Sequence, residues 1–182
     1  MNLKNFYYDM ESDNFRLRQY TVSDAPELFQ LLADDEVLRY FSMKKLSGVE
    51  EAEDVIISYL DGIEKGTSLR WAIADRDSDQ LIGMAGFRRF DHANFRAEIG
   101  YGLMPNHWGK GIAKKAVRLL VDHGFQILHL HTIEAQVEPQ NIGSIKVLES
   151  VGFRQEGFFK ENYYFDGKFL DTLVFSIVNP AD

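Results

Sequence analysis

The sequence predicts a single-domain α/β (α+β) fold with a mixed, mostly antiparallel, twisted sheet of about seven strands, flanked by about four helices. Two observations carry this prediction. Three strand patterns with short connections span residues 69–103, which is typical of an antiparallel meander. After residue 103, strand and helix patterns alternate in units of about 30 residues, which is typical of a crossover between parallel strands.

The first half of the chain contains two helix patterns and four strand patterns. Residues 15–20 alternate at period two and predict the first strand, and Ser23 is the expected N-cap of a helix that runs to residue 33. Residues 49–65 place apolar side chains at helical spacing. Strands are expected at 69–74, 81–87 and 96–103, with turns at 75–80 and 91–95.

The second half predicts a helix at 109–125, a strand at 129–137 and a helix at 141–151. Two final strands, at 153–165 and 168–177, are joined at Asp166-Gly167, a dipeptide typical of tight hairpins. We therefore expect strands 96–103 and 129–137 to be parallel neighbours at the centre of the sheet, with antiparallel strands on both sides.

Composition excludes several classes of function. The chain has no cysteine, which rules out disulfides, thiolate metal sites and a cysteine nucleophile within it. Its net charge of -8 disfavours binding to a nucleic-acid backbone. No signal segment or membrane span is predicted, so we expect a cytoplasmic protein that binds no membrane. His129 and His131 share a face of one predicted strand, but nothing completes a metal site, and we expect none. His107 and His123 are expected at the surface or on the flank of a helix.

A turn with two glycines joins strand 96–103 to the next helix. Pro105 ends the strand, and Gly109 and Gly111 come just before the helix. The first N–H groups of a helix lack intrahelical partners and carry a partial positive charge. Because glycine has no Cβ, a ligand can approach the backbone closely. The turn therefore predicts a site for a phosphate or a pyrophosphate.

Three other interpretations of this turn can be compared with its residues. A P-loop needs a longer glycine spacing and a hydroxyl residue after Gly-Lys, whereas Gly111 is followed by Ile112. A dinucleotide-binding fingerprint needs a third glycine where the chain has Lys114, although Glu138 at the end of the next strand fits that motif. A glycine turn that only caps a helix stays open at this point.

A second segment of the sequence narrows the choice among these interpretations of the glycine turn. Asn141-x-x-Ser144 is followed by Val-Leu-Glu-x-x-Gly-Phe at 147–153, and Ala-Glu-Ile-Gly-Tyr at 97–101 precedes the turn. Together these segments resemble the GNAT family of acyl-CoA-dependent N-acetyltransferases, whose loop pattern Gln/Arg-x-x-Gly-x-Gly/Ala falls on residues 108–113, with Trp108 in place of the usual first residue. The segments look like the branch that contains ribosomal-protein N-terminal alanine and serine acetyltransferases, and the resemblance extends from about Phe15 to the end of the chain.

The resemblance implies acetyl-CoA as co-substrate, bound where the central parallel pair splays apart. It implies one N-acetyltransferase domain over 1–182, with an N-terminal extension at 1–14 and a core for acetyl-CoA at 96–153. The pantetheine arm would pair with the backbone of Tyr101, Gly102 and Leu103. Because glycines weaken a strand, we expect a bulge or a close ligand at Gly100 and Gly102. The pyrophosphate would lie on the backbone amides of Trp108, Gly109, Lys110, Gly111, Ile112 and Ala113.

Acetyl transfer to an amine needs a base, because an ammonium group has no lone pair. Glu98 is the best candidate, since strand alternation puts it on the same face as Gly100 and Gly102. An equally open alternative is an ion pair between this carboxylate and Arg88, Arg89 or Arg96. Asp91, His92 and Tyr101 are weaker candidates by position.

The leaving thiolate benefits from a proton donor. Many members of the family have a tyrosine at the position of Leu148, and the resemblance suggests Ser144 as the donor instead. Asn141 is expected to cap the following helix and also to contact the pantetheine.

The predicted function is therefore acetyl transfer from acetyl-CoA to a primary amine, either a protein N-terminal α-amine or the amine of a small molecule, by direct attack. The alternative is a catalytically silent CoA-binding regulatory module. By the resemblance, the aromatic residues of the last hairpin line an acceptor cleft and a homodimer is plausible. The acidic face of helix 49–65 attracts a cationic amine or is simply solvated.

Overall fold

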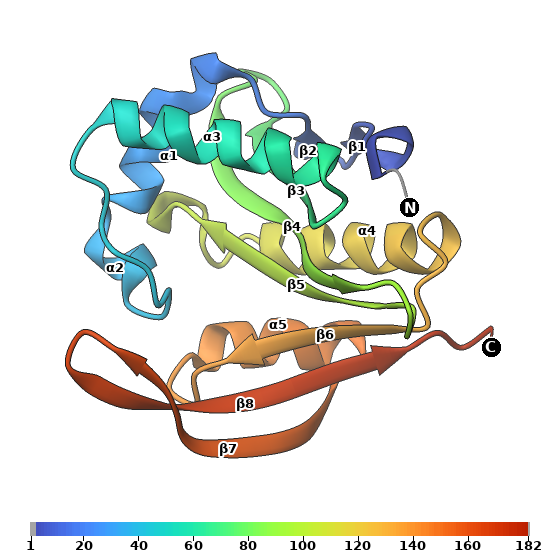
Figure 1. The fold of residues 1–182 in the computed structure, drawn as a ribbon. Helices are drawn as coiled ribbons and strands as arrows, with labels where there is room; N and C mark the ends of the chain where they lie inside the picture. Colours follow the sequence, from blue (N-terminus) through green and yellow to red (C-terminus); the bar gives the residue numbers. More distant parts are fainter. Residues whose placement is uncertain (1–2, 182) are drawn as a thin grey trace.

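The computed structural model describes residues 3–181, which fold around one twisted sheet with the strand order β1-β2-β3-β4-β5-β6-β8-β7 (Figure 1). The strands are β1 (Met10–Glu11), β2 (Phe15–Arg18), β3 (Ser68–Asp75), β4 (Leu81–Asp91), β5 (Arg96–Leu103), β6 (Thr132–Val137), β7 (Arg154–Phe165) and β8 (Lys168–Val178). The helices are α1 (Ala25–Leu32), α2 (Asp35–Leu38), α3 (Val49–Glu64), α4 (Ile112–Gln126) and α5 (Ile142–Val151). Short 3₁₀ turns are Leu3–Phe6, Val22–Asp24 and Pro105–His107.

The predicted fold class is confirmed. The sheet is mixed and mostly antiparallel, and β5 and β6 form its parallel pair with antiparallel neighbours on both sides. The sequence patterns missed β1 and α2. Each is very short, and α2 is a single turn whose N-terminal amides donate to the Asp34 carboxylate, at 2.8 Å from Glu36 N and 3.1 Å from Val37 N. Neither element is long enough to show a hydrophobic period.

Helices cover both faces of the sheet (Figure 1). On one face, α1, α2 and α3 bury Leu28, Leu31 and Ile56 against Ala72 and Met84 of the sheet. The other face buries α4 and α5, and that core contains the largest fully buried side chains of the sheet, Trp71, Phe15, Phe87 and Phe175. The expected N-terminal extension begins outside the described residues. From Leu3 on it packs into the core, where the Tyr7 ring lies 5.3 Å from Trp71.

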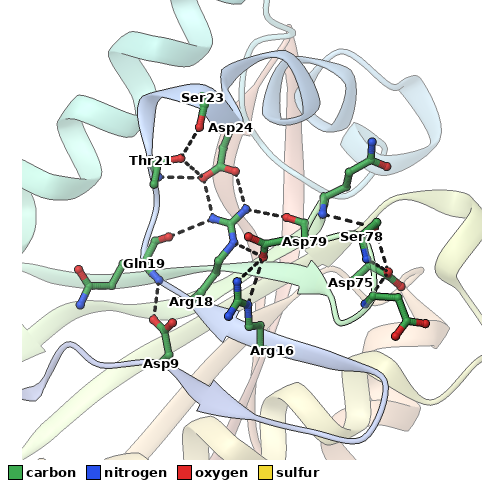
Figure 2. Close-up of polar contacts among 12 residues, drawn as sticks. Asp9, Arg16, Arg18, Gln19, Thr21, Ser23, Asp24, Asp75, Ser78 and Asp79 are labelled. Carbon is green, nitrogen blue, oxygen red and sulfur yellow. Dashed lines mark hydrogen bonds and ion pairs between the residues drawn. The ribbon is translucent and has the colours of Figure 1, made fainter.

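The entry to α1 differs from the prediction. Ser23 is not the N-cap; Thr21 caps a 3₁₀ turn that leads into α1, in a capping box with Asp24. Asp24 is buried because it also accepts two hydrogen bonds from the Arg18 guanidinium, at 2.8 and 2.6 Å (Figure 2). Nε of Arg18 donates to Asp79 at 2.8 Å. A buried ion pair thus fastens the start of α1 to β2 and to the turn before β4.

None of the helices described in residues 3–181 is long and apolar enough to cross a membrane. The cytoplasmic location stays a prediction.

The expectation that His123 lies at the surface is wrong. Its side chain, on α4, is 3% exposed and packs edge-on against Trp71 and Tyr8, with ring centroids 5.3 and 5.1 Å away. Because burial disfavours the charged imidazolium, the pKa of His123 falls from 6.5 to about 4.

This buried histidine makes the fold sensitive to acid. Between pH 6.5 and about 4, the unfolded chain binds a proton at His123 that the folded chain excludes. The free energy of unfolding therefore falls as the pH falls through this window, by about 3 kcal/mol in total. Urea unfolding across this window measures the slope. His123→Phe is expected to flatten the slope and His129→Asn, at an exposed histidine, to preserve it; equal slopes in the wild type and His123→Phe contradict the assignment.

Candidate active site

A pocket of about 270 Å³ opens between β5, β6, the start of α5, residues 40–43 and β8. Three residues predicted for the site line it: Tyr101, Asn141 and Ser144. Glu98 and residues 108–113 are not part of its wall. The predicted site residues therefore form one group in the pocket and one at and beyond the end of β5, and Glu98 lies in neither.

Strands β5 and β6 diverge after a short paired stretch (Figure 1). The two strands pair only at Arg96↔Thr132, Ala97↔Ile133 and Glu98↔Glu134, although β5 continues to Leu103 and β6 to Val137. Beyond Glu98, the side of β5 that faces β6 has no strand partner, so it presents backbone groups to a ligand in an extended conformation.

The bulge expected at Gly100 and Gly102 is absent, because both residues keep regular antiparallel pairing with β4. The close approach at these glycines is made by side chains of the protein. A Cβ on Gly102 would lie 2.7 Å from Cζ of Phe41, and a Cβ on Gly100 would lie 3.8 Å from Nη1 of Arg70. Glycine at 102 thus lets the Phe41 ring rest directly on the strand beside the pocket.

Beyond β5, the chain forms the predicted glycine turn. Gly109 and Gly111 have φ angles of 72° and 77°, a conformation that favours glycine, and there is open space where a Cβ would be at either position. Gly111 is the N-cap of α4, and no side chain caps the first amides of the helix. The indole Nε1 of Trp108 donates to the carbonyl of Leu103 at 2.8 Å, which ties the turn to the end of β5. Lys110 is exposed.

At the start of α5, Asn141 is the helix cap that the sequence predicts, and its Oδ1 accepts from the backbone N–H of Ser144 at 3.1 Å. The Ser144 hydroxyl donates to the Tyr101 hydroxyl at 3.1 Å, and the Tyr101 hydroxyl lies 3.3 Å from the Ser144 carbonyl, to which it donates. Burial raises the pKa of Tyr101 to about 12. Leu148 lines the same pocket and has no proton to give.

The sequence analysis missed the side chain of Tyr101 as a partner of Ser144. Strand alternation alone places Tyr101 on the opposite face from Glu98, and that signal points toward the helix that covers this face. The two hydroxyls form a chain on the pocket wall, where a proton can be delivered.

Glu98 is found in the ion-paired arrangement that the sequence analysis gave as the alternative. Its carboxylate is 4% exposed and accepts from Arg88 through Nε at 2.8 Å and through Nη2, and from Arg89 through Nη1 at 2.8 Å. Arg96 is not a partner, since it pairs with Asp91 and Glu134. The carboxylate is therefore already engaged by two guanidinium groups in this structure.

A different carboxylate lies in the pocket wall. Glu138 follows β6 and lines the pocket, and its carboxylate has no hydrogen bond or ion pair in the described part of the chain. Burial raises the pKa of Glu138 above its ordinary value of 4.5. The group is therefore a better proton acceptor than an exposed glutamate.

Most of the other residues considered in the sequence analysis lie outside the pocket. Of the hairpin aromatics, Tyr163 lines the pocket, whereas Phe158, Phe159 and Tyr164 are exposed elsewhere. Helix α3 contributes Tyr59 to the wall, and its acidic side chains do not contribute.

His129 and His131 precede β6, so the prediction that they share its face is wrong. Within residues 3–181, no group of three or more His, Cys, Asp or Glu side chains is arranged to hold a metal ion.

Comparison with known proteins supports one family. The family described as "Acetyltransferase (GNAT) domain" matches residues 14–154. A protein of Bacillus licheniformis named "Uncharacterized N-acetyltransferase p20" is 40% identical over 92% of this chain and 94% of its own length.

Solved structures share the fold. Mycobacterium smegmatis RimJ, solved in complex with CoA-disulfide, is 28% identical, with a TM-score of 0.83 over 90% of this chain and 81% of its own. The spermidine N-acetyltransferase of Vibrio cholerae, solved with CoA and spermine, is 24% identical, with a TM-score of 0.81 over 92% of this chain and 97% of its own. At that identity the second likeness concerns the fold alone.

Proposed function

Because the chain belongs to the GNAT family of acetyltransferases, we propose that it transfers an acetyl group from acetyl-CoA to a primary amine by direct attack. The observation that carries the proposal is the divergence of β5 and β6 between the pocket and the glycine turn. It leaves an extended backbone edge between the acceptor pocket and the anion site at the glycine turn. The pocket, the edge and the turn follow the same order as the thioester, the pantetheine arm and the pyrophosphate of acetyl-CoA. The CoA bound to RimJ supports the same assignment.

Each part of acetyl-CoA then has its own backbone partner. The pyrophosphate lies on the amides of residues 108–113, at the start of α4. The pantetheine pairs with Tyr101, Gly102 and Leu103 as an added strand, and Asn141 contacts it from the start of α5. A backbone N–H near Leu103 polarises the thioester carbonyl as the oxyanion forms.

The chemical step moves protons at both ends of the reacting group. The ammonium loses a proton, the amine nitrogen attacks the thioester carbon, and the C–S bond breaks after the tetrahedral intermediate has formed. The nitrogen then loses a second proton, and the thiolate of CoA takes up one proton, so that the protons of this step balance. The amide and CoA are released. We assign the first proton to Glu138, and the proton for the thiolate to the Ser144–Tyr101 pair. Glu98 remains the sequence-based alternative for the base.

One assay tests the proposal. Thiol release from acetyl-CoA is followed over a panel of amino acids, peptides, polyamines and aminoglycosides, and thermal unfolding is measured with and without CoA. Release with an amine, together with stabilisation by CoA, is expected. Stabilisation without release for any amine favours the silent CoA-binding module, which the Leu148 position keeps open. No stabilisation contradicts both.

The proton-transfer roles predict a loss of kcat without a loss of cofactor affinity. Glu138→Gln and Ser144→Ala are each expected to lower kcat by about 100-fold, with the KM for acetyl-CoA nearly unchanged. The wild-type rate should fall as the pH falls through the raised pKa of Glu138, and Glu138→Gln should lose this dependence. Steady-state kinetics against pH measure both effects.

Glu98→Gln is the comparison that separates the two assignments of the base. It leaves Arg88 and Arg89 poorly paired and is expected to lower stability more than Glu138→Gln does. If Glu98→Gln lowers kcat more than Glu138→Gln does, and only Glu98→Gln loses the pH dependence, then Glu98 is the base. The predicted homodimer is independent of these roles and stays a prediction.

A further inference from the structure

Arg70 carries a positive charge into the acceptor pocket without an acidic partner. It extends from β3, lines the pocket, and lies over the Tyr59 ring, with the guanidinium carbon 5.4 Å from the ring centroid. Its Nε is buried and has no hydrogen-bond partner within the part of the chain that the structure describes. A buried donor without a partner costs stability, so such a group is typical of a site that is completed by a ligand.

The other arginines of the pocket, unlike Arg70, each have a carboxylate partner. Arg88 and Arg89 share the carboxylate of Glu98. Glu138 and Asp171 line the pocket, and neither carboxylate makes an ion pair with Arg70. Among the described residues of the wall, Arg70 is therefore a cation that no carboxylate neutralises by direct contact. An acceptor that carries a carboxylate beside its amine is complementary to this pocket.

The position of Arg70 fits a ligand whose carboxylate and amine share one carbon atom. Its Nη1 lies 3.8 Å from the place of a Cβ on Gly100, one residue before the edge of β5 assigned to the pantetheine. In an α-amino acid the nitrogen is about 2.5 Å from the carboxylate carbon, by the standard bond lengths and angle. A carboxylate on Arg70 thus keeps the amine next to the thioester.

The rest of the wall suits an apolar side chain. Tyr40, Phe41, Tyr59, Met84 and Leu148 surround the pocket, and its volume of about 270 Å³ is small for a ligand site. A long polyamine would place further positive charge near Arg70, which is unfavourable.

We propose that the acceptor is a free α-amino acid with an apolar or aromatic side chain, and that Arg70 binds its carboxylate. The inference rests on the proposed acetyl transfer and names its substrate class. A planar guanidinium can bind a carboxylate through two parallel hydrogen bonds, which an amide in the same place cannot reproduce.

The test compares phenylalanine with phenylalaninamide as acceptors at saturating acetyl-CoA. The wild type is expected to use the acid with a kcat/KM about 100-fold above that of the amide, since at least one charged hydrogen-bond pair distinguishes them. Arg70→Met should remove this preference by lowering kcat/KM for the acid only, and Arg70→Lys should retain part of it. Arg118→Met, at an exposed arginine of α4, is the matched control and should leave both rates unchanged.

A binding measurement keeps this inference separate from the reaction. Calorimetric titration with N-acetylphenylalanine in the presence of CoA should show a Kd that Arg70→Met raises about 100-fold, whereas N-acetylphenylalaninamide should bind both proteins equally weakly. Acetyl transfer without a preference for the acid, or with a preference for spermidine, overturns the inference and leaves the proposed function standing. Absent transfer with Arg70-dependent binding of N-acetylphenylalanine overturns the function and leaves the carboxylate site standing. If N-acetylphenylalanine does not bind to the wild type, the proposed carboxylate site at Arg70 is overturned.

Discussion

Replacing Gly111 with aspartate is expected to raise the KM for acetyl-CoA by about 100-fold, because two charged hydrogen bonds to the pyrophosphate are lost and a like charge is added. The fold should persist. Gly111 has a φ of 77°, which aspartate tolerates better than most residues, and an acidic side chain at a helix start is favourable. The new carboxylate would occupy the open space above the first amides of α4.

Gly167→Asp is the matched control for this substitution. Gly167 also has a φ of 77° and open space at its Cβ position, but it lies in the β7–β8 turn. Steady-state kinetics with varied acetyl-CoA, together with thermal unfolding, separate binding from folding. An unchanged KM in Gly111→Asp, or an equal rise in Gly167→Asp, contradicts the placement of the pyrophosphate.

Asp24→Ala is expected to lower the free energy of unfolding by about 3–5 kcal/mol, the range for removing one partner of a buried ion pair. Arg18 and Asp24 are 8% and 5% exposed, and the substitution leaves the guanidinium with the half-exposed Asp79 as its carboxylate partner and with the carbonyl of Gln19 (Figure 2). The cap of the 3₁₀ turn before α1 is lost as well. Urea unfolding at neutral pH measures the change.

Two control variants test this prediction. Asp35→Ala breaks an exposed pair with Lys45 and should change the stability by less than about 1 kcal/mol. Arg18→Met combined with Asp24→Ala should be less destabilised than Asp24→Ala alone, because no buried charge is left unpaired. Additive effects in the double variant would show that the two charges do not stabilise each other.

The same pair contributes to acid sensitivity. Burial by itself raises the pKa of Asp24, but hydrogen bonds from Arg18 and Thr21 bring it below its ordinary value of 3.8. Its contribution to stability is therefore present above pH 3.8 and is lost as the pH falls through the lowered pKa. The loss occurs at a lower pH than the loss caused by His123, so the two can be separated by pH.

The parts of the fold and site that the sequence predicts are those encoded locally. The glycine turn before α4, the Asn141 cap and the Asp166-Gly167 hairpin each depend on a few neighbouring residues, and all three structural elements are present. The parallel pair follows from connection lengths and the handedness of crossovers.

What the sequence could not predict depends on which distant residues meet. Arg70 is one residue in an alternating strand, and only the assembled sheet shows that it lies beside Tyr59 and Gly100 and that no carboxylate of the described residues forms an ion pair with it. The sequence leaves Glu98 open between a base and an ion pair, and only the irregular end of β4 shows that Arg88 and Arg89 both contact it. The sequence shows that His123 can carry a charge, which favours an exposed position. It does not show that the Trp71 ring packs against this histidine.

The order β6-β8-β7 has a consequence for the sequence of events during synthesis. Strand β6 pairs with β5 over three residue pairs and with β8 over six, and β7 pairs only with β8. The meander of β2, β3, β4 and β5 can therefore pair as soon as it leaves the ribosome, whereas β6 and β7 must wait for β8. The wall of the acceptor pocket on that side would be the last part to become rigid, and a nascent chain that stalls before β8 would present the glycine turn without a pocket beside it.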